Sequence, residues 1–304
     1  FGLLLQVTGA QDLKFDEQKL VSSRNFANKI RNAARFAGMN LDGYVPGEPN
    51  PTTSADKWIF TRLAQLVESI DAAFEEFEFG EITRQLYSFF WNEFCDWYIE
   101  FSKSRLSKDA DPQDRLDCQR NLVFVLDQAI RLLHPIMPFV TEEIYQELPG
   151  EKQAKHLIVA SWPQAAALKQ YCDEDAAAAI GMVCDAVSAI RSTRARYGIS
   201  PKSVLDVVIK AKEGADLLEQ QASLISSLAN VSSLTISADA EKPAGSSVSL
   251  AGSLEVYVAL SGLVDFDAER ARLQSERDKV SKDAAKLEKK LSNQGFLAKA
   301  APEI

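Results

Sequence analysis

Apolar side chains recur every three or four positions over most of the first 150 residues, which predicts amphipathic helices rather than strands. In the segment RNFANKIRNAARF, which starts at Arg24, the apolar residues Phe26, Ile30, Ala33 and Phe36 share one helical face. Long helices joined by short loops form bundles. We therefore expect a mainly α fold that begins with a helical bundle at 1–150, with helices over 16–37, 54–77, 81–104, 111–134 and 141–148.

Capping residues set the expected ends of these helices. Asp16, Ser54 and Asp111 are expected N-caps, and a proline follows the last of them at the first helical position. Gly38 is the expected left-handed stop of the first helix, and Thr141 the expected start of the last one. Three prolines and two glycines between the first and second helices predict a loop there.

The periodicity changes after Pro201. Short β-branched or apolar runs bounded by glycine, proline and serine are typical of strands. We interpret 151–264 as a connector helix, at about 173–197, and a small α/β module, with strands expected at 204–209, 233–237, 246–250 and 254–260 and a helix at 214–229.

The final segment, 265–304, is highly charged and carries a narrow apolar seam with coiled-coil spacing. A lone helix cannot bury such a seam, so we expect it to need an antiparallel partner. We predict a turn at 293–295 and a return helix that starts at Phe296. The seam consists of Phe266, Leu273, Val280, Ala284, Leu287 and Leu291.

The charge of the chain is unevenly distributed. The net charge of −9 over 304 residues argues against general coating of nucleic acid. However, the stretches 18–36 and 186–205 contain basic residues and no acidic ones, whereas 68–81 carries six acidic residues. Basic strips on an acidic body suit a protein that positions one RNA and repels others.

The polar side of the first helix carries Arg24, Asn28, Asn32 and Arg35. Arginine and asparagine can contact phosphates and base edges, although a solvated polar face would have the same composition. The aromatic residues between 87 and 101 are expected to form bundle core rather than a stacking surface, because they recur at helical spacing. Further along, Arg191 and Arg194 either contact phosphate or complement a helix dipole.

Several classes of site are not expected. The four cysteines form no CxxC pair and are expected to be free thiols, with Cys95 and Cys184 buried. The only two histidines are isolated, which leaves no cluster for a metal and no nucleophile–base set, and we expect His134 to be structural. No glycine-rich phosphate loop is present, and no apolar run approaches the ~18 residues of a membrane span.

Six stretches, in order, resemble the tRNA-recognition half of class I aminoacyl-tRNA synthetases of the valine type, and together they cover essentially the whole chain. They are DLKFDEQKLVSSRNFANKIRNAARF at 12–36, DKWIFTRL at 56–63, FFWNEFCDWYIEFSK at 89–103, LLHPIMPFVTEEIYQEL at 132–148, IRSTRARYGISPKSVLDVVI at 190–209 and the charged helix at 263–304.

The resemblance implies an anticodon-binding bundle at 1–150, a junction module at 151–264 and a truncated coiled-coil arm at 265–304. It implies a parent enzyme that joins valine to its tRNA using ATP and Mg. Neither a HIGH-like nor a KMSKS-like sequence is present, so we expect no catalytic residue and no cofactor in this chain. Because the chain lacks an initial Met and both ends look cut, we expect a fragment, with the catalytic and editing domains upstream.

The resemblance also assigns roles to individual residues. The anticodon is expected to lie on the polar side of the first helix, with an exposed ring, Phe36 or Trp58, stacking on a base. Arg191, Arg194, Arg270 and Arg277 are expected to contact the tRNA backbone or elbow. The expected partner is a valine tRNA, in the cytoplasm, without DNA or membrane. The protein is expected to be monomeric, with contacts possible through the unpaired arm helix.

Two alternatives remain at this stage. An isoleucine-type synthetase has a similar bundle but tends to end in a cysteine-rich zinc module, whereas no cysteine follows Cys184 here. A non-enzymatic scaffold would instead dimerise through 265–293 and bind no tRNA.

Overall fold

The computed structural model describes residues 1–7, 17–150 and 152–292, which belong to two compact units. The first unit comprises residues 1–185 and 214–222, and the second comprises 186–213 and the chain from 223 onward. Each unit is described by itself below.

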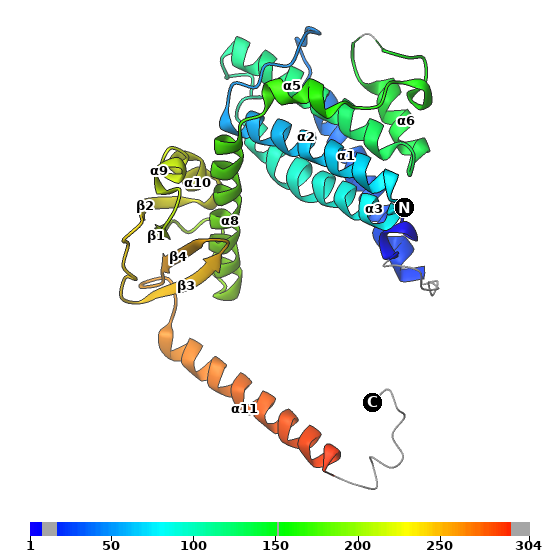
Figure 1. Ribbon diagram of the computed structural model, residues 1–304. Helices are drawn as coiled ribbons and strands as arrows, with labels where there is room; N and C mark the ends of the chain where they lie inside the picture. Colours follow the sequence, from blue (N-terminus) through cyan, green and yellow to red (C-terminus); the bar gives the residue numbers. More distant parts are fainter. Residues whose placement is uncertain (8–16, 151, 293–304) are drawn as a thin grey trace. The chain divides into compact units, whose positions relative to one another are not determined.

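The first unit is a helical bundle, as the sequence predicts (Figure 1). Its core is formed by large side chains that are fully buried, among them Phe26, Phe60, Phe90 and Leu126. Helix α2 packs against α3 and α5, and α1 packs against α5 and α6. The helices are α1 (Glu17–Met39), α2 (Ser54–Glu75), α3 (Phe79–Ser88), a π-helix (Phe89–Tyr98), α4 (Ile99–Ser102), α5 (Pro112–Leu133), α6 (Pro138–Glu147), α7 (Ala165–Leu168) and the first half of α8 (Glu174–Arg196).

The N-cap of α2 is Thr53 rather than the expected Ser54. The Thr53 hydroxyl accepts a hydrogen bond from the Asp56 amide at 3.1 Å, and the Asp56 carboxylate accepts one from the Thr53 amide at 3.2 Å. This reciprocal capping box satisfies two amides that would otherwise lack partners, so it fixes the helix start one residue earlier. The expected cap at Asp111 is confirmed, because its carboxylate accepts from the amides of Gln113 and Asp114.

Other expected helix ends are wrong by a few residues. Helix α1 continues through Gly38 to Met39, and the left-handed glycine, Gly43, lies in the following loop. Helix α6 begins at Pro138 rather than Thr141, because proline is well suited to the first helical position. The expected cap at Asp16 lies outside the described residues.

The predicted helix 81–104 is continuous from Phe79 to Ser102, but ten of its residues, FFWNEFCDWY, are π-helical. π-Helical turns are rare, and the apolar spacing that predicts a helix does not distinguish them from α-helical ones. The break before this helix falls at Phe77, a non-glycine residue with a φ of 58°, whereas the sequence predicts the break between 77 and 81.

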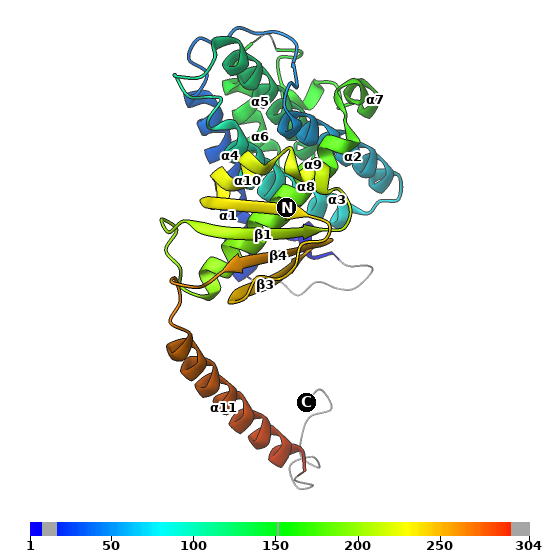
Figure 2. The ribbon, with the colours of Figure 1, turned by 90° about the vertical axis from the view of Figure 1, so that its left-hand side faces the viewer.

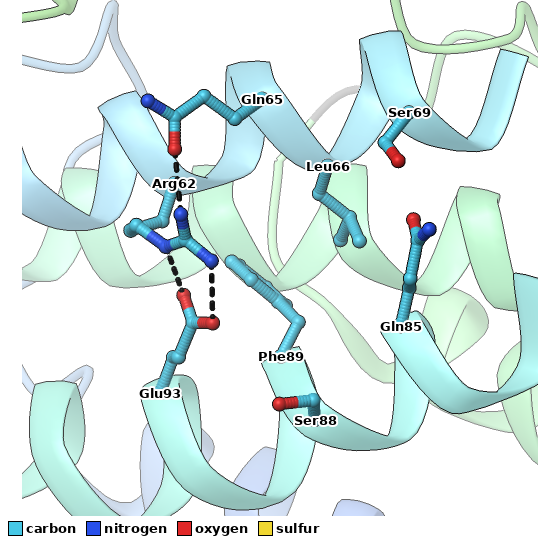
Figure 3. A pocket seen from close by; sticks show the side chains of 8 residues that line it. All are labelled: Arg62, Gln65, Leu66, Ser69, Gln85, Ser88, Phe89 and Glu93. Carbon is cyan, nitrogen blue, oxygen red and sulfur yellow. Dashed lines mark hydrogen bonds and ion pairs between the residues drawn. The ribbon is translucent and has the colours of Figure 1, made fainter. Parts of the chain in front are cut away.

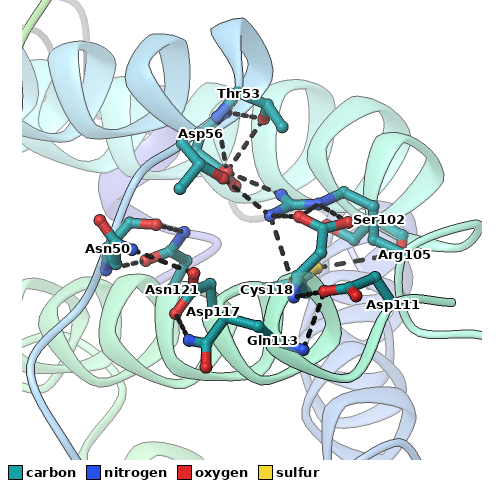
Figure 4. Close-up of polar contacts among 12 residues, drawn as sticks. Asn50, Thr53, Asp56, Ser102, Arg105, Asp111, Gln113, Asp117, Cys118 and Asn121 are labelled. Carbon is teal, nitrogen blue, oxygen red and sulfur yellow. Dashed lines mark hydrogen bonds and ion pairs between the residues drawn. The ribbon is translucent and has the colours of Figure 1, made fainter.

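A buried ionic network joins α2 to the end of the π-helix and to α5 (Figure 4). The Asp56 side chain is fully buried and accepts hydrogen bonds from the Tyr98 hydroxyl at 2.8 Å and from Arg105 Nη1 at 2.7 Å. Arg105 also donates to the carboxylate of Asp114, with its Nη2 2.7 Å from Oδ1. Burial and the neighbouring Asp56 raise the pKa of Tyr98 well above its ordinary value, so its hydroxyl stays a donor.

The loop between α1 and α2 is attached to α5. The amide of Asn50 donates to the Asn121 side chain at 2.8 Å, and the Asn121 amide group donates back to the Asn50 carbonyl at 2.9 Å. Gln119 donates to the carbonyl of Asn40 at 2.7 Å. These bonds hold the proline-rich loop and thereby the C-terminal end of α1.

The second unit contains the predicted sheet, with strand order β2-β1-β4-β3. Figure 2 shows β1, β4 and β3 side by side. β1 pairs with β2 in parallel and with β4 antiparallel, and β3 pairs with β4 antiparallel. The expected strands are confirmed within about two residues, and the helix expected at 214–229 is present as two helices. The elements are β1 (Leu205–Ala211), α9 (Ala215–Glu219, assigned to the first unit), α10 (Ala222–Ala229), β2 (Val231–Ser237), β3 (Ser246–Ala251), β4 (Leu254–Ala259) and α11 (Phe266–Leu291).

Helix α8 meets the length and hydropathy expected of a membrane-crossing helix, with 23 residues and a mean hydropathy of 1.2 over 18 of them. Half of that window is buried within the protein, and α8 also buries the polar residues Thr193 and Arg194. A core helix passes the same test, so one such helix is weak evidence for a membrane span.

Candidate nucleic-acid interface

The polar side of α1 faces solvent. Arg24, Asn28, Arg31, Asn32 and Arg35 are all exposed, and we call them the α1 stripe. The opposite side is buried in the bundle, because the apolar residues predicted for it pack there; Phe26, Ile30 and Ala33 are exposed by 4% or less.

Four side chains of the α1 stripe form no hydrogen bond or ion pair with any residue that the structure describes. They are those of Arg24, Asn28, Asn32 and Arg35. The fifth, Arg31, forms an ion pair with Glu143 of α6. Beyond Glu17, α1 carries no acidic residue of its own. The stripe therefore offers guanidinium and amide groups whose hydrogen-bonding capacity is available to a ligand.

Lys29 is adjacent to the α1 stripe but has a structural role. Its Nζ lies 2.6 Å from the Asp96 carboxylate and 3.8 Å from the centroid of the Trp91 ring. This ion pair and cation–π contact attach α1 to the π-helix. Lys29 is thus engaged with Asp96 and Trp91 within the bundle.

The expectation that Trp58 offers an exposed ring is wrong. Its side chain is only 5% exposed and packs edge-on against Phe101, with ring centroids 5.9 Å apart. Trp58 is buried because α2 lies inside the bundle and is covered on most of its circumference. Phe36 is half-buried at the edge of α1.

The aromatic residues of the third helix are mainly core, as predicted. Phe89, Phe90, Phe94 and Tyr98 are at most 1% exposed. The most exposed large apolar side chain among the described residues is instead Phe139 on α6, with 90% of its surface exposed. The sequence motif LLHPIMPFVTEEIYQEL contains this residue, but the helical period does not indicate that its ring faces solvent.

Arg194 is not available to a phosphate, contrary to the expectation. Its side chain is buried and donates to the carbonyl oxygens of Ser200, Ala229 and Asn230 at 2.8 to 3.1 Å. Burial lowers the pKa of its guanidinium, and the three carbonyls accept hydrogen bonds from its two terminal nitrogens. Arg191 is exposed and donates to the Leu228 carbonyl at 3.1 Å, so its contact with tRNA stays a prediction.

Helix α11 is present where the coiled-coil pattern predicts it. Arg270 and Arg277 are exposed, and each forms a surface ion pair with a neighbouring aspartate, Asp267 and Asp278. Five seam residues, Phe266, Leu273, Val280, Leu287 and Leu291, are 44 to 62% exposed. The predicted turn at 293–295 and the return helix from Phe296 lie outside the described residues.

A polar cleft of about 320 Å³ lies between α2 and the α3/π-helix segment (Figure 3). Its carboxylate, Glu93, is held by two hydrogen bonds from Arg62, at 2.8 and 3.0 Å. The buried Oε1 of Gln85 has no hydrogen-bond partner among the described residues. The residues that line the cleft include no histidine or cysteine, so the cleft does not present a nucleophile–base pair.

All four cysteines are free, and Cys118 is buried, whereas Cys95 and Cys184 are only partly buried, contrary to expectation. Burial raises the pKa of Cys95 to about 12, so its thiol stays protonated. Within the described residues no group of histidine, cysteine and carboxylate side chains could hold a metal ion.

His134 packs at the α5–α6 junction, with its Nδ1 2.8 Å from the Thr141 hydroxyl. Burial lowers the pKa of His134 from 6.5, outweighing the opposite effect of Glu142. The unfolded chain therefore binds this proton more tightly, so the free energy of unfolding should fall as the pH drops below about 6.5. In urea titrations between pH 7.5 and 5, His134→Gln should lessen this acid-dependent loss. His156→Gln should retain it, because the His156 side chain is 57% exposed and its 3.1 Å contact with Glu142 is a surface pair that contributes little free energy. Equal behaviour of the two variants would contradict the assignment.

A comparison with protein families identifies the family to which this bundle belongs. A family model described as the anticodon-binding domain of tRNA ligase matches residues 56–209, which is half of the chain. The chain belongs to this family. A second model, the tRNA-binding arm of valyl tRNA synthetase, matches residues 265–304 and so includes α11.

The relatives of the chain extend the match to residues outside both family models. The valine--tRNA ligase of Bacillus subtilis is 39% identical over 97% of the chain, that of Syntrophotalea carbinolica 38% over 100%, and that of Bacillus cereus strain ATCC 14579 41% over 97%. The chain spans about a third of the length of these relatives. The valine-type resemblance is therefore confirmed over the isoleucine-type alternative.

A solved structure of a leucine-type enzyme from Agrobacterium radiobacter K84, in a complex with tRNA, is more distant. The match covers 54% of this chain and 19% of the chain of that enzyme, with a TM-score of 0.40 and 17% identity.

Proposed function

We propose that the chain is the tRNA-recognition part of a valine--tRNA ligase and holds the anticodon of valine tRNA on the α1 stripe. The observation that carries this proposal is the set of exposed arginines and asparagines on α1 that have no partner among the described residues. In the proposal, ATP and Mg serve the catalytic part of the enzyme, and this chain contributes neither a catalytic residue nor a cofactor. The enzyme would act in the cytoplasm as a monomer, without DNA or membrane.

The chemistry of the α1 stripe suits an anticodon loop. Bases in such a loop are unpaired, so their Watson–Crick edges are open to asparagine side chains and arginine forks. Arginine also binds phosphate through two parallel hydrogen bonds. The acidic character of the chain as a whole would discourage other RNA segments from binding elsewhere.

The arm would contact the tRNA elbow through Arg270 and Arg277, while Arg191 would bind backbone phosphate. Both arm arginines are exposed and paired only with surface aspartates. Surface ion pairs contribute little free energy, so a phosphate can replace the aspartate at small cost.

The exposed seam of α11 favours a second candidate, a scaffold that dimerises through this helix. Five apolar seam residues are 44 to 62% exposed, which suits an antiparallel partner from a second copy. Sedimentation of the chain with and without tRNA separates the candidates, because the scaffold should be a dimer that does not bind tRNA.

Arg24→Ala and Arg35→Ala test the α1 stripe. Each should weaken binding of a valine anticodon stem–loop, by about 1–3 kcal/mol for an arginine that contacts a base; for one that contacts a phosphate, the salt slope should fall by about 1. Because both side chains are exposed, the free energy of unfolding should change by less than about 0.5 kcal/mol. Lys108→Ala removes the same charge from another exposed position and is the matched control. Equal binding by all three variants would contradict the proposal.

A further inference from the structure

Phe139 lies on α6, the helix that packs against α1. Its ring is 90% exposed, although neighbouring residues of α6, Ile144 and Tyr145, are only 1% exposed. A ring this exposed contributes almost nothing to the bundle core. Single exposed apolar residues are common on protein surfaces, so a role for this ring depends on what surrounds it.

The ring is close to the α1 stripe along the surface of α6. Phe139 and Glu143 are four residues apart, so they lie on the same face of the helix, one turn from each other. Glu143 forms the ion pair with Arg31 of the α1 stripe. The exposed ring and the cationic stripe therefore belong to one continuous surface of the first unit.

The first turn of α6 holds this ring on a fixed backbone. Pro138 begins the helix, and the Thr141 hydroxyl donates to the Met137 carbonyl at 2.8 Å. The same hydroxyl contacts His134 at 2.8 Å. A ring carried by such a turn needs little reorganisation to bind a ligand.

A second exposed phenylalanine has different surroundings. Phe77 is 76% exposed, but it lies in the turn after α2 among Glu75, Glu76 and Glu78. Those three carboxylates form no ion pair with a described residue, so they repel a phosphodiester chain. The carboxylates nearest Phe139, Glu142 and Glu143, are instead paired with His156 and with Arg31 of α1. The two residues therefore form a matched pair that differs in the surrounding charge.

We infer that Phe139 is a stacking platform for one unpaired base of the RNA held on the α1 stripe, and that Glu143 positions Arg31 toward the same RNA. This inference rests on the proposed function. Stacking on an aromatic ring stabilises a bound base whatever its identity. Glu143 accepts one hydrogen bond from Arg31, and the other N–H donors of Arg31 are left for a phosphate or a base.

The test uses the full 304-residue chain and a valine anticodon stem–loop that carries 2-aminopurine at one loop position after another. Phe139→Ala should weaken binding ~5–150-fold and abolish the fluorescence change at one position. Phe139→Trp should retain affinity and show quenched tryptophan emission on binding. Phe77→Ala should bind as the unsubstituted chain does, and thermal unfolding should be unchanged in all three variants.

A double-mutant cycle tests the positioning residue. Glu143→Ala should weaken binding severalfold in the unsubstituted chain and have no further effect once Arg31→Ala is present. Glu143→Gln, which can still accept the hydrogen bond, should recover most of the affinity. Independent effects of the two alanine substitutions would overturn the positioning role.

Normal binding by Phe139→Ala, or an equal loss in Phe77→Ala, would overturn the stacking inference. If the unsubstituted chain binds the stem–loop and Arg24→Ala weakens it while Phe139→Ala does not, only this inference fails. If the unsubstituted chain does not bind the stem–loop, the proposed function fails together with it.

Discussion

Replacing Arg105 with alanine should lower the free energy of unfolding of the first unit by about 3–5 kcal/mol, because it leaves a buried carboxylate without its counter-charge. Asp56 is fully buried, and the Arg105 side chain is 13% exposed, with 2.7 Å between Nη1 and Oδ2. Tyr98 would then be the one neighbouring side chain outside the capping box that still donates to Asp56. All four tryptophans, at positions 58, 91, 97 and 162, lie in the first unit, so urea unfolding followed by tryptophan fluorescence reports on this unit.

Arg62→Ala is the matched control for this change. Arg62 also forms an arginine–carboxylate pair between two segments of the bundle, with Glu93. The Arg62 and Glu93 side chains are 43% and 16% exposed and both line the polar cleft of Figure 3, which water can enter. Water stabilises the charges when the pair is broken, so the loss should be at most about 1 kcal/mol. If the two variants unfold at the same urea concentration, the buried network does not have the role assigned to it.

Arg194→Ala should destabilise the second unit by about 1–3 kcal/mol, the usual cost of one buried acceptor left without its donor. The guanidinium donates to three carbonyls, from the turn after α8 and from the junction of α10 with β2. Its removal leaves the buried Ala229 carbonyl without this donor, whereas the Ser200 and Asn230 carbonyls still accept from the amides of Ser203 and Leu205. Hydrogen exchange of the β1 and β2 amides should speed up accordingly.

Arg196→Ala is the matched control, because it removes a second arginine from the end of α8 that forms no buried hydrogen bond with the described residues. Arg196 is exposed, and its guanidinium lies 5.6 Å from the Tyr197 ring, a contact that contributes about 1 kcal/mol or less. Unchanged exchange in Arg194→Ala, combined with weaker binding of tRNA, would restore the original expectation that Arg194 contacts phosphate.

The bundle was predictable because each helix carries a clear three- or four-residue apolar repeat, and the exposed side of α1 follows from the same repeat. The burial of Trp58 could not be predicted from this repeat. A helical repeat identifies the buried face but not its width, and α2 is buried on most sides because other helices surround it. The width depends on neighbours that are distant in sequence.

Arg194 and Phe139 show the same limit for individual sites. The basic end of α8 suggested a phosphate contact, but the acceptors of Arg194 include carbonyls 35 and 36 residues away, which only the folded chain brings together. Phe139 was part of a recognised motif, yet its exposure depends on how α6 packs. Local sequence patterns do not contain that information.

Anticodon recognition by the α1 stripe is tested by measuring how the chain binds three RNAs across a salt series. The three are valine tRNA, isoleucine tRNA and a valine tRNA with a swapped anticodon. We expect the valine anticodon to be preferred at every salt concentration and the swap to remove this preference. Equal affinity for all three, with a steep dependence on salt, would mean that the basic strips contact phosphate alone and would contradict anticodon recognition by the α1 stripe.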